Sequence, residues 1–292
     1  MNFQTQYNHD KDVVDQALGT YFQDDTAPYH TLLEAMRYSL TAGGKRLRPV
    51  LVLAFCRACG GDAQAALPAA CAIEMVHTYS LIHDDLPCMD NDELRRGKPT
   101  NHVIYGECTA TLAGDALQAE AFRTILESGL PAQTRAECAR ILAEAAGTNG
   151  ICGGQQLDME GEQKLLTKDE LLEIHKRKTA AMIRAACLMG IACGNGTPKQ
   201  IQAAEQYAKA LGLAFQIRDD MLDVISTVEE LGKPIGSDAQ EGKTTFMSLY
   251  GAERCQQYVH ELTEQAAAAV ADGFTEPDFL QALVRSLEAR RT

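Results

Sequence analysis

The stretch from Glu74 to Thr100 reads EMVHTYSLIHDDLPCMDNDELRRGKPT and carries an acidic cluster, Asp84 to Asp90, directly after an apolar segment. A second segment, Gly212 to Asp223, reads GLAFQIRDDMLD and ends in another acidic cluster, Asp219 to Asp223. Two carboxylates about 4 Å apart repel each other by about 4 kcal/mol at an effective dielectric constant near 20. We therefore expect a cation near each cluster. A few hard oxygen ligands suit Mg²⁺, which keeps several waters and shares its shell with substrate phosphates. The two clusters predict an Mg²⁺ site between two helices, although two solvated acidic helix ends would have the same composition.

The residues around the first cluster indicate how its side chains are presented. His77, Leu81 and Asp84 are spaced i, i+4 and i+7, so they share one helix face. This alignment makes His77 a candidate site residue, with a core histidine as the alternative. Pro87 prevents Asp84 and Asp90 from lying on one regular helix, so we expect the chain to bulge and turn both carboxylates toward a common ion.

Basic residues accompany both clusters. Asp219 and Asp223 are spaced i, i+4 on one face of a continuous predicted helix, and Arg95 and Arg96 follow the first cluster by a few residues. The arginine side chain presents a planar fork of donors that matches phosphate. The segment from Gly43 to Pro49, GGKRLRP, adds three cations within four residues. Acidic clusters next to cations are expected where Mg²⁺ and cationic side chains neutralise a polyphosphate, and a surface ion-pair network is the alternative.

Composition and periodicity predict an all-α protein. The chain has 292 residues, of which 46% are hydrophobic, and it contains several Ala- and Leu-rich segments. No alternating β-branched run stands out as a strand, and no segment resembles a linker, so we expect one domain over residues 1–292. The predicted helices cover Asp10–Gln23, His30–Thr41, Pro49–Cys59, Pro68–Asp84, Thr109–Ser128, Pro131–Thr148, Thr167–Cys193, Lys199–Ile225, Thr244–Val270 and Pro277–Arg290.

Net charge and cysteine usage restrict the possible partners and compartments. The formal net charge is −13 and the pI is near 5.0, which argues against a general nucleic-acid or anionic-membrane binder. No apolar run approaches the length of a membrane span, and the polar N-terminal segment lacks the apolar core of a signal peptide. Cys56 and Cys59 are spaced C-x-x-C within an apolar helical stretch, but no second pair completes a zinc site, so we expect them to be buried free thiols in a reducing compartment. These features predict a cytosolic protein.

Six motifs together resemble a known enzyme family. They occur in the order GGKRLRP, EMVHTYSLIHDDLPCMDNDELRRGKPT, GDAL, GICGGQQLD, HKRKTAAMIRAA and GLAFQIRDDMLDV. Over about Leu33 to Arg285 this order is similar to that of the trans-polyprenyl diphosphate synthases. The first aspartate motif carries two extra residues, as in bacterial farnesyl diphosphate synthases.

The resemblance implies an isoprenoid synthase fold, in which a helical bundle surrounds a central cavity and the two aspartate motifs face each other. It implies a homodimer that condenses isopentenyl diphosphate head to tail with an allylic diphosphate. The implied Mg²⁺ ligands are Asp84, Asp90 and Asp219. The implied isopentenyl diphosphate site consists of Lys45, Arg48, His77 and Arg96, and the allylic site of Arg95, Lys178, Thr179, Gln216 and Lys233. Arg95 and Lys178 join the three aspartates as the implied catalytic residues. Ala180 replaces the glycine that relatives often have after Thr179, and we expect little consequence.

The residues just before Asp84 bear on product length. Ser80 is small and lies near the face of Asp84, whereas Tyr79 lies on the flank of the helix and by periodicity alone could be a core residue. In the family, a bulky aromatic residue at the Tyr79 position stops growth at fifteen carbons. The resemblance therefore favours farnesyl diphosphate, with geranylgeranyl diphosphate as the alternative product.

Two other functions are compatible with parts of the pattern. A class I terpene cyclase shares the fold and one aspartate motif, but typically lacks the second motif and the GGKRLRP segment. A non-catalytic partner subunit usually loses one aspartate motif. This chain retains all of these segments.

Overall fold

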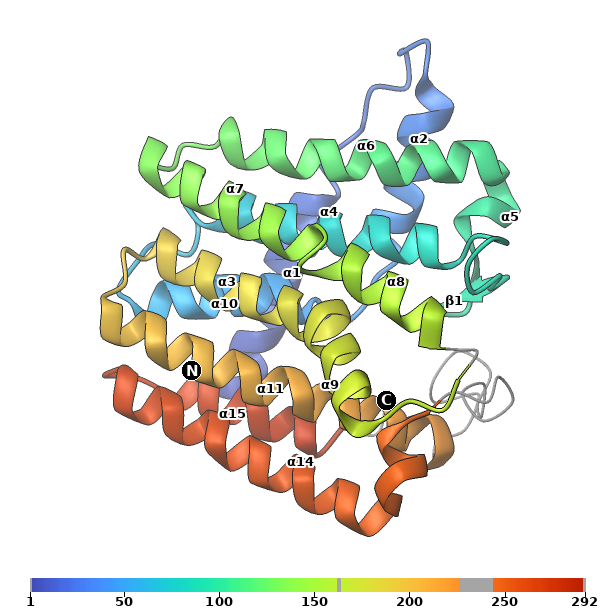
Figure 1. Ribbon diagram of the computed structural model, residues 1–292. Helices are drawn as coiled ribbons and strands as arrows, with labels where there is room; N and C mark the ends of the chain where they lie inside the picture. The colour runs from blue at the N-terminus through green and yellow to red at the C-terminus, as the bar shows by residue number, and fades with distance from the viewer. Residues whose placement is uncertain (1, 162–163, 226–243, 291–292) are drawn as a thin grey trace.

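The computed structural model describes residues 2–161, 164–225 and 244–290, and this part of the chain is almost entirely helical (Figure 1). The predicted all-α class is therefore confirmed. The helices are α1 (Phe3–Leu18), α2 (His30–Leu40), α3 (Leu47–Ala58), α4 (Leu67–Asp84), α5 (Asn101–Tyr105), α6 (Glu107–Leu126), α7 (Ala132–Ala146), α8 (Ile151–Gly161), α9 (Lys168–His175), the π-helical turn η1 (Lys176–Ala180), α10 (Ala181–Cys193), α11 (Pro198–Ile225), α14 (Phe246–Gly273) and α15 (Asp278–Glu288).

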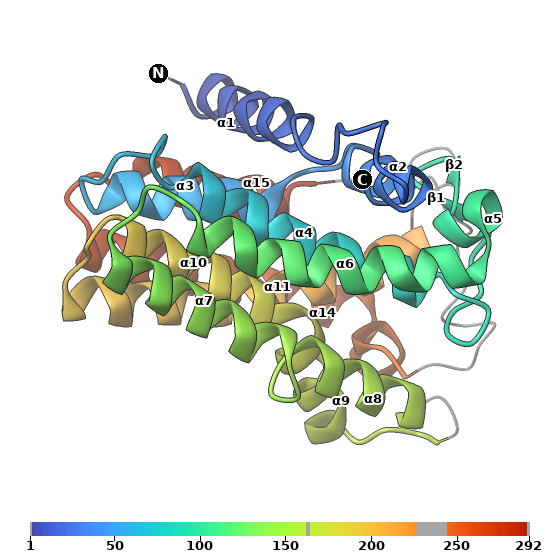
Figure 2. The same cartoon turned by 90° about the horizontal axis from the view of Figure 1, so that it is seen from above.

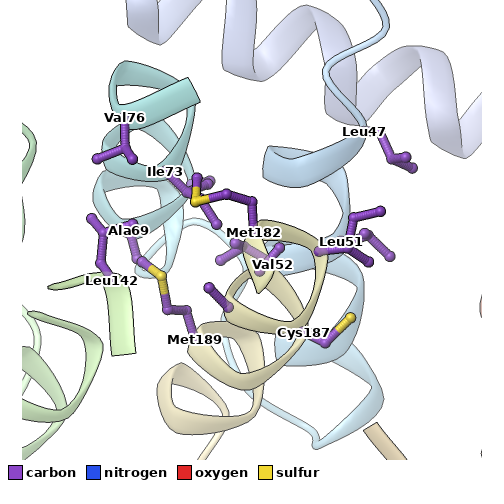
Figure 3. Close-up of a cluster of buried hydrophobic side chains, with 14 of the residues drawn as sticks. Leu47, Leu51, Val52, Ala69, Ile73, Val76, Leu142, Met182, Cys187 and Met189 are labelled. Atoms are coloured by element: carbon purple, nitrogen blue, oxygen red, sulfur yellow. The ribbon is translucent and has the colours of Figure 1, made fainter. Parts of the chain in front are cut away.

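Helix α10 lies at the centre of the hydrophobic core. Figure 3 shows Met182 and Met189 of α10 among apolar side chains of α3, α4 and α7. Nearly every residue from Met182 to Ile191 is buried, as expected for a helix that is apolar on all sides. A second, smaller cluster joins α9, α11 and α14. Burial of this central helix fixes the positions of the helices packed around it.

The directions of the helices bring the two acidic clusters to the same end of the bundle. Arg184 of α10 pairs with Glu205 of α11, and Thr179 of η1 bonds to Gln216, so η1 and α10 run antiparallel to α11. Helix α4 is also antiparallel to α10, because its Ala69 lies near Met189 (Figure 3). Helices α4 and α11 therefore run in the same direction and end on the same side of the bundle (Figure 1).

The observed helices differ from the sequence prediction at α1, at α8 and from α9 to α10, and the short helix α5 was also not predicted. The first helix begins at Phe3, because the Asn2 side chain accepts a hydrogen bond from the Thr5 N–H (2.8 Å), and it ends at Leu18 before Gly19. Helix α8 was not predicted, because Gly150, Gly153 and Gly154 weaken its helical signal. The single helix expected from Thr167 is divided into α9, η1 and α10.

A short β-hairpin follows the first acidic cluster. Strands β1 (Leu94–Arg95) and β2 (Lys98–Pro99) pair antiparallel, and the two turn residues Arg96 and Gly97 have φ values of 54° and 72°. Positive φ at both central residues is typical of the tight turns that match strand twist. Each strand has only two residues, too few to produce an alternating pattern in the sequence.

Of the two cysteines expected to be buried free thiols, Cys56 is buried and Cys59 is partly buried. All ten are free thiols, and five of them, including Cys56, are buried. In the described ranges no helix is long and apolar enough to cross a membrane.

Phe55 provides a test of the core. Its ring is fully buried and packs edge-on against Tyr207 of α11 (5.3 Å between centroids) and Phe274 (5.7 Å). We expect Phe55→Ala to lower the free energy of unfolding by about 3–5 kcal/mol, because the cavity removes contacts among three segments. The control Tyr29→Ala, at a side chain that is 59% exposed, should change it by less than about 0.5 kcal/mol. Urea unfolding followed by circular dichroism measures both, and equal effects would contradict the assignment of this core.

Candidate active site

The first acidic cluster lies where α4 ends. The helix stops at Asp84, and the chain turns so that the Asp90 N–H donates to the Asp84 carbonyl oxygen (2.9 Å). Burial raises the pKa of Asp84 to about 6, Lys178 acts in the opposite sense, and the nearby Asp90 raises it further. The expected bulge is therefore present, and it brings Asp84 and Asp90 close enough to influence each other.

The second carboxylate of this cluster has a different partner. Asp85 is 3% exposed and accepts two hydrogen bonds from the Arg95 Nε atom, at 2.7 and 2.9 Å. Arg95 belongs to β1, so this pair ties the hairpin to the end of α4. Arg95 thus lies at the first acidic cluster, as the sequence predicts, with its guanidinium bound to Asp85.

Lys178 lies among carboxylates on the opposite side of the site. Its Nζ atom donates to Asp158 of α8 at 2.6 Å. Burial lowers the pKa of Lys178, but Asp158, Asp84 and Asp90 outweigh burial, so the net pKa is raised and the ammonium group stays charged. Helix α8 approaches η1 closely because residue 154 is glycine. A β-carbon on Gly154 would lie only 2.3 Å from the backbone nitrogen of Lys178. The π-helical turn that presents Lys178 is a feature found often at functional sites.

Thr179 begins a chain of hydrogen bonds to the second acidic cluster. Its hydroxyl donates to the Gln216 Oε1 (2.9 Å), and the Gln216 Nε2 donates to Asp220 (3.0 Å). Asp220 is buried and also accepts from the Phe246 N–H (2.8 Å) at the start of α14. Through these hydrogen bonds Asp220 links α11 to the start of α14 and holds Gln216 beside Thr179.

Asp219 lies on a different face of α11 and is 40% exposed at its side chain. It forms an ion pair with Arg290, whose guanidinium also lies over the Phe215 ring at 4.3 Å. The Nε and Nη1 atoms of Arg290 are buried without hydrogen-bond partners. Burial lowers the pKa of Arg290 to about 10, and Arg218 adds to this effect. The end of the described chain therefore contributes a cation to the site that the sequence analysis did not assign.

Four predicted residues form a separate basic pocket. The Nε atom of Arg48 is buried without a partner, and Arg96 donates to the Gly43 carbonyl oxygen. Burial lowers the pKa of His77 well below its usual value, and Arg48 and Arg96 add to the effect, so its imidazole is neutral. Burial, then Arg290 and Arg96, lower the pKa of Lys45 to about 8. So many cations close together favour binding of a multivalent anion.

Arg46, the third cation of GGKRLRP, does not join this pocket. It is 3% exposed and donates to Asp15 (2.7 Å), Glu74 (2.6 Å) and the Leu40 carbonyl oxygen (2.8 Å). These partners use the guanidinium within the protein. Arg46, which the sequence analysis did not assign to a site, instead links α1, the end of α2 and α4 beneath the pocket.

The residues present fit Mg²⁺ that is completed by a substrate. Across residues 2–161, 164–225 and 244–290, no three His, Cys, Asp or Glu side chains are grouped so as to hold an ion. Asp84, Asp90 and Asp219 therefore do not make one ready ligand set. Mg²⁺ is commonly held by one or two carboxylates together with waters and substrate phosphates, and the paired Asp84 and Asp90 match that arrangement.

The two candidate product-length residues lie one turn before Asp84. Tyr79 is 5% exposed, and its hydroxyl lies 3.4 Å from the Ala146 carbonyl oxygen and 3.8 Å from the Cys152 Sγ. The ring thus lies between α4 and the break from α7 to α8. Ser80 is buried and donates to the His77 carbonyl oxygen of its own helix (3.0 Å).

Comparison with known proteins agrees with this geometry. A sequence model of the family described as polyprenyl synthetase matches residues 29–281. The chain belongs to this family. It is 49% identical to the farnesyl diphosphate synthase of Geobacillus stearothermophilus over 252 residues, which cover 84% of each chain. It is also 50% identical to the chloroplastic geranylgeranyl pyrophosphate synthase 3 of Arabidopsis thaliana over 242 residues, which cover 81% of this chain and 67% of the relative.

A solved structure shows the same architecture. The apo FPP/GFPP synthase of Zymomonas mobilis superposes with a TM-score of 0.88 at 36% identity, covering 98% of this chain and 99% of that chain. The polyprenyl synthetase described here is therefore an all-α prenyltransferase, and its relatives carry names for more than one product.

Lys233 lies outside the described residues. Sequence reasoning missed Asp158 and Arg290, the partners of Lys178 and Asp219. Asp158 ends the motif GICGGQQLD, so its carboxylate was a visible signal, whereas one arginine at the end of the last predicted helix carries no comparable signal.

The lowered pKa of Lys45 predicts a pH dependence. Lys45 is cationic below pH 8 and loses its charge above it, so metal-free affinity for inorganic diphosphate should fall as pH rises from 7 to 9. Lys45→Arg should bind with a flatter pH profile, because a guanidinium stays charged over this range. Isothermal titration calorimetry at several pH values measures this, and parallel profiles for both proteins would contradict the assignment.

Proposed function

We propose that this polyprenyl synthetase condenses isopentenyl diphosphate with dimethylallyl and then geranyl diphosphate to give farnesyl diphosphate. The observation that carries the proposal is the position of Lys178, whose charge is stabilised by Asp158 together with Asp84 and Asp90 of the first aspartate cluster. A cation and a carboxylate pair facing each other suit an allylic diphosphate bound through Mg²⁺.

The two anionic substrates are assigned to different groups of residues. We assign isopentenyl diphosphate to the basic pocket of Lys45, Arg48, His77 and Arg96, since the buried Arg48 Nε atom lacks a protein partner. The allylic diphosphate is assigned to Lys178, Thr179, Gln216, Arg95 and Lys233. Thr179 and Gln216 support this assignment because their hydrogen bond holds them beside Lys178 and Asp220.

Departure of the allylic diphosphate creates a carbocation and a concentrated anion. Mg²⁺, held by Asp84, Asp90 and Asp219, would supply positive charge at the departing oxygens. Lys178 and Arg95 stabilise the same charge with preorganised donors, which is the most effective form of electrostatic catalysis. The neutral His77 binds its anion by hydrogen bonding without adding charge.

A fifteen-carbon product is supported by the buried ring of Tyr79, which occupies the space between α4 and the α7–α8 break. Geranylgeranyl diphosphate is the second candidate, because relatives about 50% identical carry that name.

The homodimer remains a proposal, which is supported by the exposed apolar side chains of Leu112 and Leu126 on α6. One domain and a cytosolic location also remain predictions, the former supported by a continuous core from α1 to α15.

The aspartate assignment is tested by isosteric substitution. We expect Asp84→Asn and Asp219→Asn each to lower turnover at least about a hundredfold, because even outer-shell partners of metal ligands contribute ten- to a hundredfold. Release of diphosphate from isopentenyl and dimethylallyl diphosphates, with Mg²⁺ present, measures turnover. Asp272→Asn, at an exposed carboxylate on α14 outside the family motifs, is the control and should keep full activity. Full activity in both site variants would refute the proposed enzyme mechanism.

The product-length assignment is tested at Tyr79. Tyr79→Ala should yield geranylgeranyl diphosphate at the expense of farnesyl diphosphate, because the vacated volume accommodates one more five-carbon unit and each buried methylene stabilises binding by about 0.8 kcal/mol. Tyr79→Phe keeps the ring and should retain the shorter product. Chromatography of the dephosphorylated products distinguishes farnesyl from geranylgeranyl diphosphate. An unchanged product from an active Tyr79→Ala enzyme would show that another residue limits chain length.

A further inference from the structure

A cavity of about 610 Å³ lies along η1 and α10, between α7 and α11. Figures 1 and 2 show α7, α10 and α11 side by side. The lining residues include none of those assigned above to metal or diphosphate, and the volume lies within the range of about 300–1,000 Å³ typical of small-molecule sites. Its walls are mainly apolar, with Ile141 and Ala145 on α7, Ala181 and Ala185 on α10, and Leu213 on α11.

The rim of this cavity carries charged side chains with an excess of cations. Arg184 pairs with Glu205 of α11 (2.6 Å) and approaches Glu144 of α7 (3.9 Å), so these three charges largely satisfy one another. Lys209 follows Glu205 by one turn and is exposed, with no hydrogen bond or ion pair to the residues that the structure describes. In a protein with a net charge of −13, an uncompensated lysine beside an apolar cavity favours an anionic group at the rim.

His175 forms part of the cavity wall. The Nε2 atom of His175 is inaccessible to solvent and has no hydrogen-bond partner, and the ring stacks on Phe246 at 5.5 Å. Burial lowers the pKa of His175 to about 4, so the imidazole is neutral at physiological pH. Because solvent does not reach this atom, a molecule in the cavity would contact the ring of His175 and not its Nε2 atom.

The cavity shares a backbone segment with the candidate active site. Ala180 lines the cavity, while the two residues before it, Lys178 and Thr179, bond to Asp158 and Gln216 in the site. Ala180 also packs tightly on α11, where a β-carbon on Gly212 would lie 2.5 Å from the Ala180 Cβ. A molecule in the cavity would therefore contact the same π-helical turn that presents Lys178.

We propose that this cavity is a second ligand site for an amphipathic anion. The apolar tail lies between α7 and α10, where the His175 ring forms part of the wall, and the carboxylate or phosphate head lies at the rim near Lys209. Binding changes the position of η1 and so alters affinity for the allylic substrate. Only this effect on activity rests on the function proposed above, because binding can be measured without turnover.

Binding is tested by calorimetry with dodecanoate and the matched neutral dodecanol, on the full chain with Mg²⁺ and inorganic diphosphate present to occupy the catalytic site. We expect dodecanoate to bind about tenfold more tightly than dodecanol. Lys209→Glu should weaken dodecanoate about five- to tenfold and leave dodecanol unchanged, because a single exposed charge pair contributes modestly and reversal adds repulsion. Lys199→Glu, at an exposed lysine on α11 outside the cavity lining, is the matched control and should bind as the unchanged protein does.

A cavity-filling variant provides a second arm. Ala181→Phe should abolish binding of both ligands, and circular dichroism with basal activity establishes that it is folded. The second site is refuted if the unchanged, active protein binds dodecanoate no more tightly than Ala181→Phe does. It is also refuted if Lys209→Glu does not weaken dodecanoate binding. Either result leaves the proposed enzyme function intact. Farnesyl phosphate distinguishes the source of the ligand: tighter binding than dodecanoate indicates an isoprenoid, and equal binding indicates a fatty acid.

The effect on catalysis is read from steady-state kinetics. Saturating dodecanoate should change KM for the allylic diphosphate at least about twofold in the unchanged protein and leave it unaltered in Ala181→Phe. Equal changes in both proteins would show that the effect does not arise from this cavity and would overturn the proposed link through η1.

Discussion

The ammonium group of Lys178 is the contact on which the arrangement of the site depends. It lies among the carboxylates of Asp158 on α8, Asp84 at the end of α4, and Asp90 in the turn after α4. Without a central cation these carboxylates would repel one another at the short distances that the packing imposes. The π-helical turn and the absence of a side chain at Gly154 allow the lysine backbone to come this close to α8. The acidic end of α4 therefore has a counter-charge on the opposite wall.

A second constraint is the division of the cations by their partners. Arg46 has its donors satisfied by Asp15, Glu74 and a backbone carbonyl, so it stabilises the fold beneath the basic pocket. Arg48 retains a buried nitrogen without a protein partner, and it lies near His77 and Arg96. Neighbouring residues of one motif thus have opposite roles, because the left-handed backbone at Arg46 directs its side chain into the protein. The same logic applies to the aspartates of the second cluster, where Asp220 is satisfied by backbone and amide donors while Asp219 remains half-exposed.

Helix η1 and α10 connect the catalytic side of the bundle to its outer side. Lys178 and Thr179 point to partners in the site, and Ala180 and Ala181 line the outer cavity. The replacement of the usual glycine by Ala180, from which we expected little consequence, adds a methyl group to the seam with Gly212. The Ala180 methyl group therefore fills the contact between η1 and α11.

The sequence by itself determined the helical class, the two acidic clusters, the basic segment and the family, because these depend on composition, periodicity and local order of motifs. It also indicated correctly that Pro87 would end the regular helix near Asp84. It did not reveal α8, whose glycines weaken the helical signal but permit close packing, or the two-residue strands beside Arg96. Only the tertiary structure decided that Asp158 pairs with Lys178, that Arg290 reaches Asp219, and that Arg46 faces inward. These pairings join residues far apart in the chain, so they depend on the packing of all the helices between them, which no local pattern encodes.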